Sequence, residues 1–353
     1  MKNYKLSDET KTLPWGTVLH RVVATTTFTL AYGITIPKGA IGGWIEKESN
    51  LSGNAWVSDN AQVYGNALVS DNAWVFGNAW VCGDAKVSDN ARVSGDVQIF
   101  GNARASCNAQ IYDNARVYGD AEVSDTARVY DKAQVYSSAK VCGDARVFGN
   151  ALVFGDAQVF GNAQVFGNAK ASCNAKVSGA AEVCSNAQVY DNAQVFGYAE
   201  VSGSAHVFGD AKVYDSTWVY DNAQVSGDAW VYDNAQVYDN ARVYGDARVF
   251  GDTLVSDDAQ VFGKALVFGD AEVCGNARVG NVSDYIVFKN KWPSDRHFTW
   301  TKSNDKWAEV EDGFYGTGDE LIKKAYADSE ASGKHYEACV KSVETLKNVE
   351  QTE

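Results

Sequence analysis

Proline is scarce in this chain of 353 residues, and one long stretch has none of it. The three prolines are Pro14, Pro37 and Pro293, so residues 51–279 contain no proline. Proline cannot donate a hydrogen bond to a β-ladder, and its absence leaves this stretch free to pair as strands. The chain also lacks an apolar run long enough to span a membrane, and its first thirty residues lack a signal-peptide pattern. We therefore expect a cytoplasmic protein with no membrane partner.

Side chains that carry catalytic chemistry are sparse as well. The seven cysteines are odd in number and include no CxxC pair, which favours reduced thiols over disulfides or a metal site. No P-loop, nucleophile elbow or zinc motif is present. Of the four histidines, only His206 lies within residues 51–279, at a repeat position otherwise filled by Gln, Arg, Lys, Glu, Leu or Trp. We expect no cofactor, no metal and no enzymatic activity.

A six-residue phrase fills the middle of the chain. From Leu51 to Val279 an aliphatic residue, nearly always Val, returns at every sixth position, 39 times in a row. The typical phrase is Gly65-Asn66-Ala67-Leu68-Val69-Ser70. Self-similarity at a fixed period indicates units that bury their apolar faces only by stacking on one another.

The phrase predicts a short strand followed by a sharp corner. Alternation puts Ala67 and Val69 on one side of a strand and Leu68 and Ser70 on the other. The Gly-Asn or Asp-Asn pair then turns the chain, because these residues tolerate left-handed backbone conformations. A long helix is excluded, since six is not a helical period. Disordered repeats would not keep their aliphatic anchors in phase. We predict an all-β parallel β-helix.

The number of hexads in one coil follows from the residue after the anchor. At a spacing of 18 residues this position stays small, as Ser52, Ser70, Ser88, Ser106, Ser124 and Cys142. At a spacing of 12 it is mixed, although Trp218 and Trp230 stand 12 apart and favour the shorter coil. We predict three hexads per coil, about 13 coils, and a rod on the order of 60 Å long.

The Gly-Asn-Ala-x-Val phrase resembles the hexapeptide repeat of left-handed parallel β-helix proteins, many of which are acyltransferases. The N-terminal sequence Tyr4–Glu9 with Gly42–Ile45 is similar to the YdcK-like hexapeptide proteins of bacteria. Arrays that end in segments like Phe298–Thr301 and Phe314–Leu321 resemble proteins of phages and prophages. The resemblance covers nearly the whole chain. It implies a left-handed solenoid and, if a phage encodes the chain, the cytoplasm of a bacterial host. Common arrays place a small or acidic residue after the anchor, where this chain often has Phe or Tyr.

The flanking segments differ from the repeats and predict three domains. Residues 1–50 form an N-terminal β cap, because the end of a solenoid exposes strand edges and an open core that must be covered. Strands are expected at residues 17–24 and 28–30, and Trp44 is a candidate plug, with a binding aromatic as the alternative. Residues 51–282 form the solenoid. Residues 283–353 form a C-terminal α+β module.

The C-terminal module is expected to hold a hairpin and two helices. Strands are expected at residues 285–288 and 297–301, and a turn at residues 303–305 leads into residues 306–310 to complete a hairpin. A capping box at Thr317 and Glu320 then opens a helix through about Ala331. Gly333 then breaks the chain before a second helix at about residues 334–347. Three tryptophans are either core or an exposed recognition patch: Trp292, Trp300 and Trp307.

The solenoid surface has two notable features. Its 27 Asp and Glu outnumber its 15 Lys and Arg, with the acids mainly at corners and the bases mainly in mid-strand. Acidic corners favour solubility, and mimicry of nucleic acid is the alternative. Aromatic residues also recur 18 apart, which predicts either a structural ladder or a binding stripe. The stripe is formed by Tyr112, Tyr130, Phe148 and Phe166.

These observations favour a non-enzymatic β-solenoid, a rigid acidic rod whose C-terminal module docks a protein partner or drives assembly into a homo-oligomer. We expect no direct binding of nucleic acid. Two alternatives stay open. A hexapeptide acyltransferase would depend on His206, and an acidic decoy would inhibit a nucleic-acid-binding or defence protein of a host.

Overall fold

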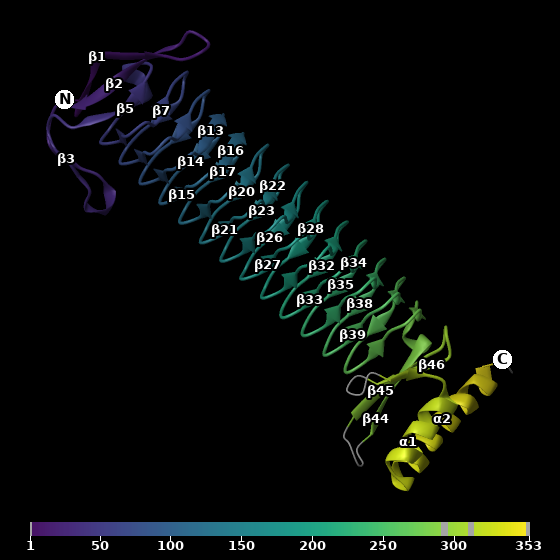
Figure 1. The fold of residues 1–353 in the computed structure, drawn as a ribbon. Helices are drawn as coiled ribbons and strands as arrows, with labels where there is room; N and C mark the ends of the chain where they lie inside the picture. Colours follow the sequence, from purple (N-terminus) through teal and green to yellow (C-terminus); the bar gives the residue numbers. More distant parts are fainter. Residues whose placement is uncertain (1, 291–295, 310–313, 351–353) are drawn as a thin grey trace. The chain divides into compact units, whose positions relative to one another are not determined.

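The computed structural model describes residues 2–290, 296–309 and 314–350. The chain forms two compact units, residues 1–198 and residues 199–353. Figure 1 shows successive turns of short strands in both units. Together the repeats make about 13 turns of a parallel β-solenoid with three strands to a turn, as predicted. The left-handed winding implied by the resemblance stays a prediction.

The first unit begins with a β-hairpin that extends one face of the solenoid. β1 (Tyr4–Thr12) pairs antiparallel with β2 (Val18–Ala24), and β2 pairs antiparallel with β5 (Ile41–Ile45). A small arm of β3 (Phe28–Thr29), η1 (Ala31–Gly33) and β4 (Thr35–Ile36) lies between them. The predicted strands match β2 and β3. β1 escaped prediction because it is mostly polar and exposed, so it lacks an alternating pattern.

Ile45, rather than Trp44, continues the row of inward anchors. β5 pairs in parallel with β7, which sets Ile45 opposite Val63 and Trp44 opposite Gln62. Ile45 is fully buried in the interior. Trp44 is on the opposite face, where Leu13 and Leu19 of the hairpin cover it. The predicted plug is therefore a buried tryptophan on the outer face of the sheet, between the solenoid and the hairpin.

Within the first unit, solenoid strands pair in parallel with the strand three further along the chain, 18 residues away. After η2 (Glu48–Asn50), three sheets result. The strands of the first sheet are β7 (Gln62–Val63), β10 (Trp80–Val81), β13 (Gln98–Gly101), β16 (Arg116–Gly119), β19 (Gln134–Val135), β22 (Leu152–Val153), β25 (Lys170–Ala171) and β28 (Gln188–Val189). Those of the second are β8 (Leu68–Val69), β11 (Lys86–Val87), β14 (Arg104–Ala105), β17 (Glu122–Val123), β20 (Lys140–Val141), β23 (Gln158–Val159), β26 (Lys176–Val177) and β29 (Gln194–Val195). Those of the third are β6 (Trp56–Val57), β9 (Trp74–Val75), β12 (Arg92–Val93), β15 (Gln110–Ile111), β18 (Arg128–Val129), β21 (Arg146–Val147), β24 (Gln164–Val165) and β27 (Glu182–Val183).

The second unit repeats this arrangement. Its first sheet contains β31 (His206–Val207), β34 (Gln224–Val225), β37 (Arg242–Val243), β40 (Gln260–Val261) and β43 (Arg278–Val279). Its second contains β32 (Lys212–Val213), β35 (Trp230–Val231), β38 (Arg248–Val249) and β41 (Leu266–Val267). Its third contains β30 (Glu200–Val201), β33 (Trp218–Val219), β36 (Gln236–Val237), β39 (Leu254–Val255) and β42 (Glu272–Val273).

The corners form as the turn residues predict. The first corner residue of every hexad from Gly53 to Gly275 has a φ between 55° and 80°. Gly and Asp fill most of these positions, because they adopt left-handed backbone at low cost. At Gly65 a Cβ would lie 3.2 Å from the backbone of Gly83, so the stacked corners also leave little room there.

The interior is a column of small and branched side chains. The Ala and Val of each hexad point inward and are almost without exposed surface, as at Ala67 and Val69. The side chains between and after them face outward. Because each turn buries the face of the next, the core of each unit runs through all of its repeats.

The C-terminal module is a four-stranded antiparallel sheet followed by two helices. The sheet contains β44 (Tyr285–Asn290), β45 (Arg296–Thr301), β46 (Lys306–Glu309) and β47 (Phe314–Gly316), and it follows η3 (Val282–Asp284). The helices are α1 (Gly318–Asp328) and α2 (Glu330–Glu350). The predicted capping box is present, with the Thr317 hydroxyl accepting from the Glu320 N–H.

The predicted break at Gly333 is wrong, because the helices separate four residues earlier. Ser329 is extended, at φ −166°, and its hydroxyl accepts a hydrogen bond from the Ser332 N–H at 3.1 Å. Gly333 lies inside α2, where a Cβ would come within 2.3 Å of the Tyr326 ring. Glycine at this position serves the close approach of α1 and α2 instead of ending a helix.

The sheet of the module has two different faces. One face and the two helices share an apolar core of Phe298, Trp300, Trp307, Leu321, Ala325, Tyr336, Val340 and Val343. Trp300 is 4% exposed and Trp307 is 2% exposed, so both belong to the core and neither contributes to an exposed patch. Trp292, the third predicted tryptophan, lies outside the described residues.

The other face of the sheet seals the last solenoid turn. Backbone N–H groups of each turn bond to carbonyls of the next, so those of the last turn have no such partner. Side chains of the C-terminal module supply the missing acceptors. The Thr299 hydroxyl accepts from the Glu272 N–H at 2.8 Å, the Ser303 hydroxyl from the Arg278 N–H at 2.6 Å, and the Tyr285 hydroxyl from the Phe268 N–H at 3.2 Å.

Candidate functional site

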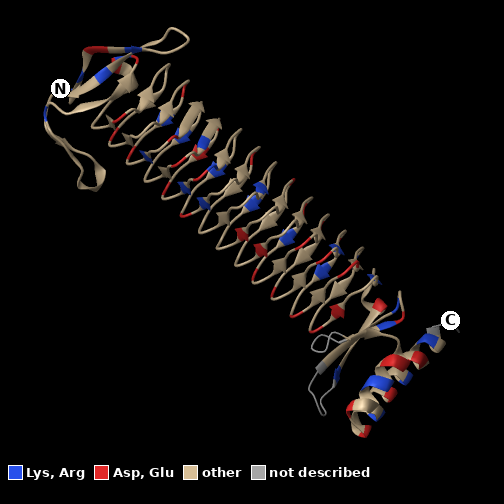
Figure 2. Cartoon of the chain, in the orientation of Figure 1, with Lys and Arg blue, Asp and Glu red and all other residues tan. Residues whose placement is uncertain are grey.

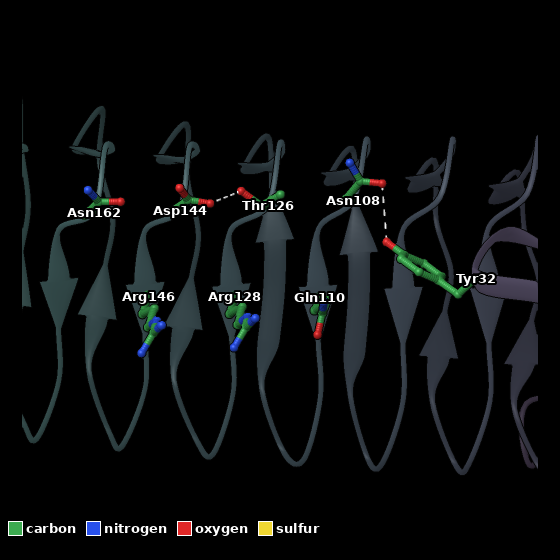
Figure 3. Close-up of a pocket in the computed structure, with 8 residues that line it drawn as sticks. All are labelled: Tyr32, Asn108, Gln110, Thr126, Arg128, Asp144, Arg146 and Asn162. Atoms are coloured by element: carbon green, nitrogen blue, oxygen red, sulfur yellow. Dashed lines mark hydrogen bonds between the residues drawn. The ribbon is translucent and has the colours of Figure 1, made fainter.

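An open groove on the third sheet of the first unit is lined by polar side chains and one aromatic ring (Figure 3). It encloses about 580 Å³ and is lined by Tyr32, Asn108, Gln110, Thr126, Arg128, Asp144, Arg146 and Asn162. Figure 3 shows two parallel rows: corner residues form one rim, and mid-strand residues form the floor. Both rows come from the hexad, which returns the same position to the same place every 18 residues.

The floor carries two arginines side by side. Arg128 on β18 and Arg146 on β21 are directly paired in register, and both side chains are exposed. Gln110 on β15 precedes them and Gln164 on β24 follows them. Like charges opposite one another on neighbouring strands destabilise a sheet. The floor of the groove therefore places two positive charges on neighbouring strands, where they repel each other.

The aromatic ladder predicted from the sequence runs beside the floor residues. Tyr112, Tyr130, Phe148 and Phe166 each follow a floor residue by two positions, so they share its outward side. Successive rings stack at 4.8–4.9 Å with interplanar angles of 1–4°. The rings are half-buried by this stacking. Burial raises the pKa of Tyr112 and Tyr130, and the nearby Arg128 opposes the shift.

This stacking supports the prediction of a structural ladder over that of a binding stripe. It also decides which part of each ring faces solvent. Parallel rings cover one another's faces and leave their edges outward. An aromatic edge carries partial positive charge, whereas the face is negative. The ladder can therefore stabilise the turns and present ring edges to solvent at the same time.

The arm of the N-terminal cap reaches the start of the groove. Tyr32, with a φ of 63°, donates its hydroxyl proton to the Asn108 side-chain oxygen at 3.3 Å. Its ring lies 5.7 Å from the Arg92 guanidinium, which also contacts the Trp74 ring at 5.4 Å. The arm thereby limits the groove at the end where Asn108 lies.

The corner rim contains one acid, which is engaged in a local contact. The Asp144 carboxylate accepts a hydrogen bond from the Thr126 hydroxyl, at a place in the corner row where Asn is usual. Elsewhere in this row, Asn54, Asn72, Asn90 and Asn108 form a chain of amide hydrogen bonds. The rim therefore presents both amide donors and one carboxylate.

Acids at the solenoid corners have a structural task. Figure 2 shows acidic residues mainly at the corners and basic residues mainly on the strands. A corner aspartate accepts a hydrogen bond from the backbone N–H of the corner one turn later, as Asp59 does from Gly77 at 3.0 Å and Asp257 from Gly275 at 2.8 Å. Backbone satisfaction, in addition to solubility, thus accounts for acids at these positions.

The structure does not bring the predicted site residues together. Tyr112, Tyr130, Phe148 and Phe166 lie along the groove, whereas Trp300 and Trp307 are core residues of the C-terminal module. His206 lies on β31 at an outward, partly exposed position opposite Gln224. The groove itself was not predicted. The 18-residue spacing of Gln110, Arg128 and Arg146 could have indicated its floor. Nothing in the sequence indicated that Tyr32 would lie at its end.

The fold and the repeat define the class of this protein as a parallel β-solenoid repeat protein. A family model for the YdcK beta solenoid repeat matches residues 61–77, 109–125, 223–239, 235–251 and 241–257. The repeats of this chain therefore match those of YdcK-like proteins. No curated protein matches the chain. Within the described residues, none of the helices is long and apolar enough to cross a membrane.

Proposed function

We propose that this protein is a non-enzymatic scaffold. Its solenoid holds rows of side chains at a fixed spacing, and its C-terminal module joins it to a partner protein or to a second copy of the chain. One observation carries the proposal: the sheet of the module uses one face to seal the last turn, as in the contact of Thr299 with Glu272. The helices on its other face are then left to meet a partner.

Exposed apolar side chains on the helices support this role. Leu346 is 52% exposed, Val349 is 54% exposed, and both lie in the last part of α2 at positions that share a helical face. Tyr326 on α1 is 42% exposed and donates its hydroxyl proton to Glu337 at 2.8 Å. Apolar side chains that remain in water are the usual anchors of contacts between proteins.

The acidic surface fits a scaffold better than a decoy. The solenoid carries a charge balance of −12, from 27 acids and 15 bases. Several of the acids accept hydrogen bonds from backbone N–H groups at the corners. Basic side chains also interrupt the acidic surface. Strong net charge keeps a long repeat protein soluble and free of unspecific association.

The test is light scattering coupled to size exclusion on the full chain and on Leu346→Asp/Val349→Asp. If the full chain is an oligomer and the double variant is a monomer, the module assembles copies of the chain. If both are monomers, the full chain is used as bait in a pull-down. A partner protein that binds the natural chain must then fail to bind the double variant. An oligomer that the variant does not disturb, or a partner that it still retains, would contradict the proposal. Lys341→Asp, an exposed charge change earlier on α2, is the control.

A further inference from the structure

The groove on the third sheet is rich in hydrogen-bond donors. Arg128 and Arg146 each offer five N–H donors, and the amides of Gln110, Asn108 and Asn162 add more. Among the described residues neither arginine forms an ion pair. The neighbouring sheet differs, because Glu122 there lies between Arg104 and Lys140, at 3.9 Å and 3.4 Å from them.

Two guanidinium groups stand in register on neighbouring strands, and neither is in an ion pair within the described part of the chain. β18 and β21 place Arg128 directly opposite Arg146, and like charges in such a pair destabilise the sheet. A ligand with carboxylates would remove this repulsion and form charge-assisted hydrogen bonds, often two to each guanidinium. The outward edges of the Tyr112–Phe166 ladder also favour negative charge.

The form of the ligand follows from the surroundings of the arginines. Amide side chains such as those of Gln110 and Asn108 donate and accept, which suits the backbone of a peptide. Side chains on one face of an extended peptide recur about every 6.6–6.8 Å, a spacing that two flexible arginines on strands about 4.8 Å apart can match. The net charge of −14 repels a long polyanion, and Tyr32 limits the groove at one end. These features favour a short segment with few charges.

We propose that this groove binds a short acidic segment of a protein, in extended conformation, with carboxylates from one face of the segment on Arg128 and Arg146. The site belongs to the first unit and is independent of the C-terminal module. It would hold a peptide even if the module had no partner.

The experiment is isothermal titration calorimetry on the full chain. The probe is a short capped peptide of Ser and Thr with two glutamates at alternate positions, and its control is the same peptide with two glutamines. We expect the glutamate peptide to bind and the glutamine peptide not to bind. Arg128→Gln and Arg146→Gln should each weaken binding about fivefold. Asp144→Asn, which removes the one negative charge of the rim, should tighten it about twofold. A tenfold rise in salt should weaken it.

Arg116→Gln is the matched control, because Arg116 is also exposed in mid-strand but belongs to the first sheet. Equal losses from Arg116→Gln and Arg128→Gln would mean unspecific attraction and would overturn the proposal. Equal binding of both peptides would also overturn it. Inorganic phosphate is titrated as well: if it displaces the peptide fully at equal concentration, the groove is an oxyanion site and not a peptide site. Thermal unfolding of each variant verifies that the repeats stay folded.

Discussion

The hydroxyl of Thr299 accepts a hydrogen bond from the backbone N–H of Glu272 at 2.8 Å, in a buried setting. Thr299 belongs to the C-terminal sheet and Glu272 to the last turn of the solenoid. This contact explains why the module begins with a sheet. The sheet supplies hydrogen-bond acceptors to the strand edge of the last turn, which has no further repeat to pair with. An uncovered edge of this kind is a site of aggregation in other β-proteins.

Removal of this acceptor should loosen the last turn. Thr299→Val keeps the shape of the side chain but leaves the Glu272 N–H unsatisfied, which costs about 1–3 kcal/mol. We expect faster amide hydrogen exchange at Glu272 and Val273 and a lower midpoint in urea. Thr10→Val, at an exposed position of β1, should change neither. Unaltered exchange at Glu272 in Thr299→Val would show that the hydroxyl is not its partner.

Removal of the whole module should cause self-association. A chain that ends at Gly280 exposes the N–H groups of Phe268, Glu272 and Arg278 that the module covers. We expect it to form larger species than the full chain in light scattering, increasing with concentration. A shortened chain that remains monomeric at all concentrations would show that the last turn needs no cover.

The aromatic ladder should contribute to stability in proportion to its contacts. Phe148 stacks on two rings, Tyr130 at 4.9 Å and Phe166 at 4.8 Å, whereas Phe166 ends the ladder with one. At about 0.5–1.5 kcal/mol per aromatic pair, Phe148→Ala should lose about twice the stacking energy of Phe166→Ala. Urea unfolding of both variants measures the ratio. Equal losses would mean that stacking does not hold the ladder together.

A corner aspartate should be replaceable by asparagine but not by alanine. Asp257 has a φ of 55°, and its carboxylate accepts from the Gly275 N–H at 2.8 Å. Asp257→Asn keeps an acceptor and a residue that tolerates this backbone, so unfolding should change little. Asp257→Ala loses the hydrogen bond and strains the corner, at about 1–3 kcal/mol. If Asn is as harmful as Ala, the charge matters more than the hydrogen bond.

High pH should destabilise the second unit through Tyr220. Burial, followed by the neighbouring Tyr238 and the carboxylates of Asp221 and Asp239, raises the pKa of Tyr220 from 10 to about 12. Between these values the unfolded chain releases the proton and the folded chain keeps it, so stability falls as pH rises. The stabilisation by protonated Tyr220 is fully present below pH 10. Tyr220→Phe should flatten the fall between about pH 10 and pH 12, measured by urea unfolding. An ultraviolet titration that finds an ordinary tyrosine pKa would contradict this.

Particular residues show how far sequence reasoning reaches. Val63, Val81 and Ile99 stand 18 residues apart, and the structure places them on adjacent strands of one sheet. The ladder from Tyr112 to Phe166 and the capping box at Thr317 were equally predictable, because each depends on spacing along the chain. In contrast, Gly333 was misread, since its reason is the Tyr326 ring on another helix.

Contacts between distant segments account for the rest. Tyr32 contacts Asn108, which is 76 residues away in the chain. Thr299 contacts Glu272 because the C-terminal sheet packs on the last turn, and local propensity does not predict that packing. Such contacts depend on which surfaces meet, and a single sequence carries no periodic signal for them.

The sequence by itself determined the parallel coil of three hexads, its Ala and Val interior and its Gly and Asp corners, because each repeat contacts its neighbours in the same way as the last. Only the tertiary structure decided what happens where repetition stops. The hydroxyls that seal the last turn, the burial of Trp300 and Trp307, the position of Trp44 under the hairpin and the arm that ends at Asn108 all arise from non-repeating segments. Their partners are chosen by shape and hydrogen-bond satisfaction across the chain, and not by spacing along it.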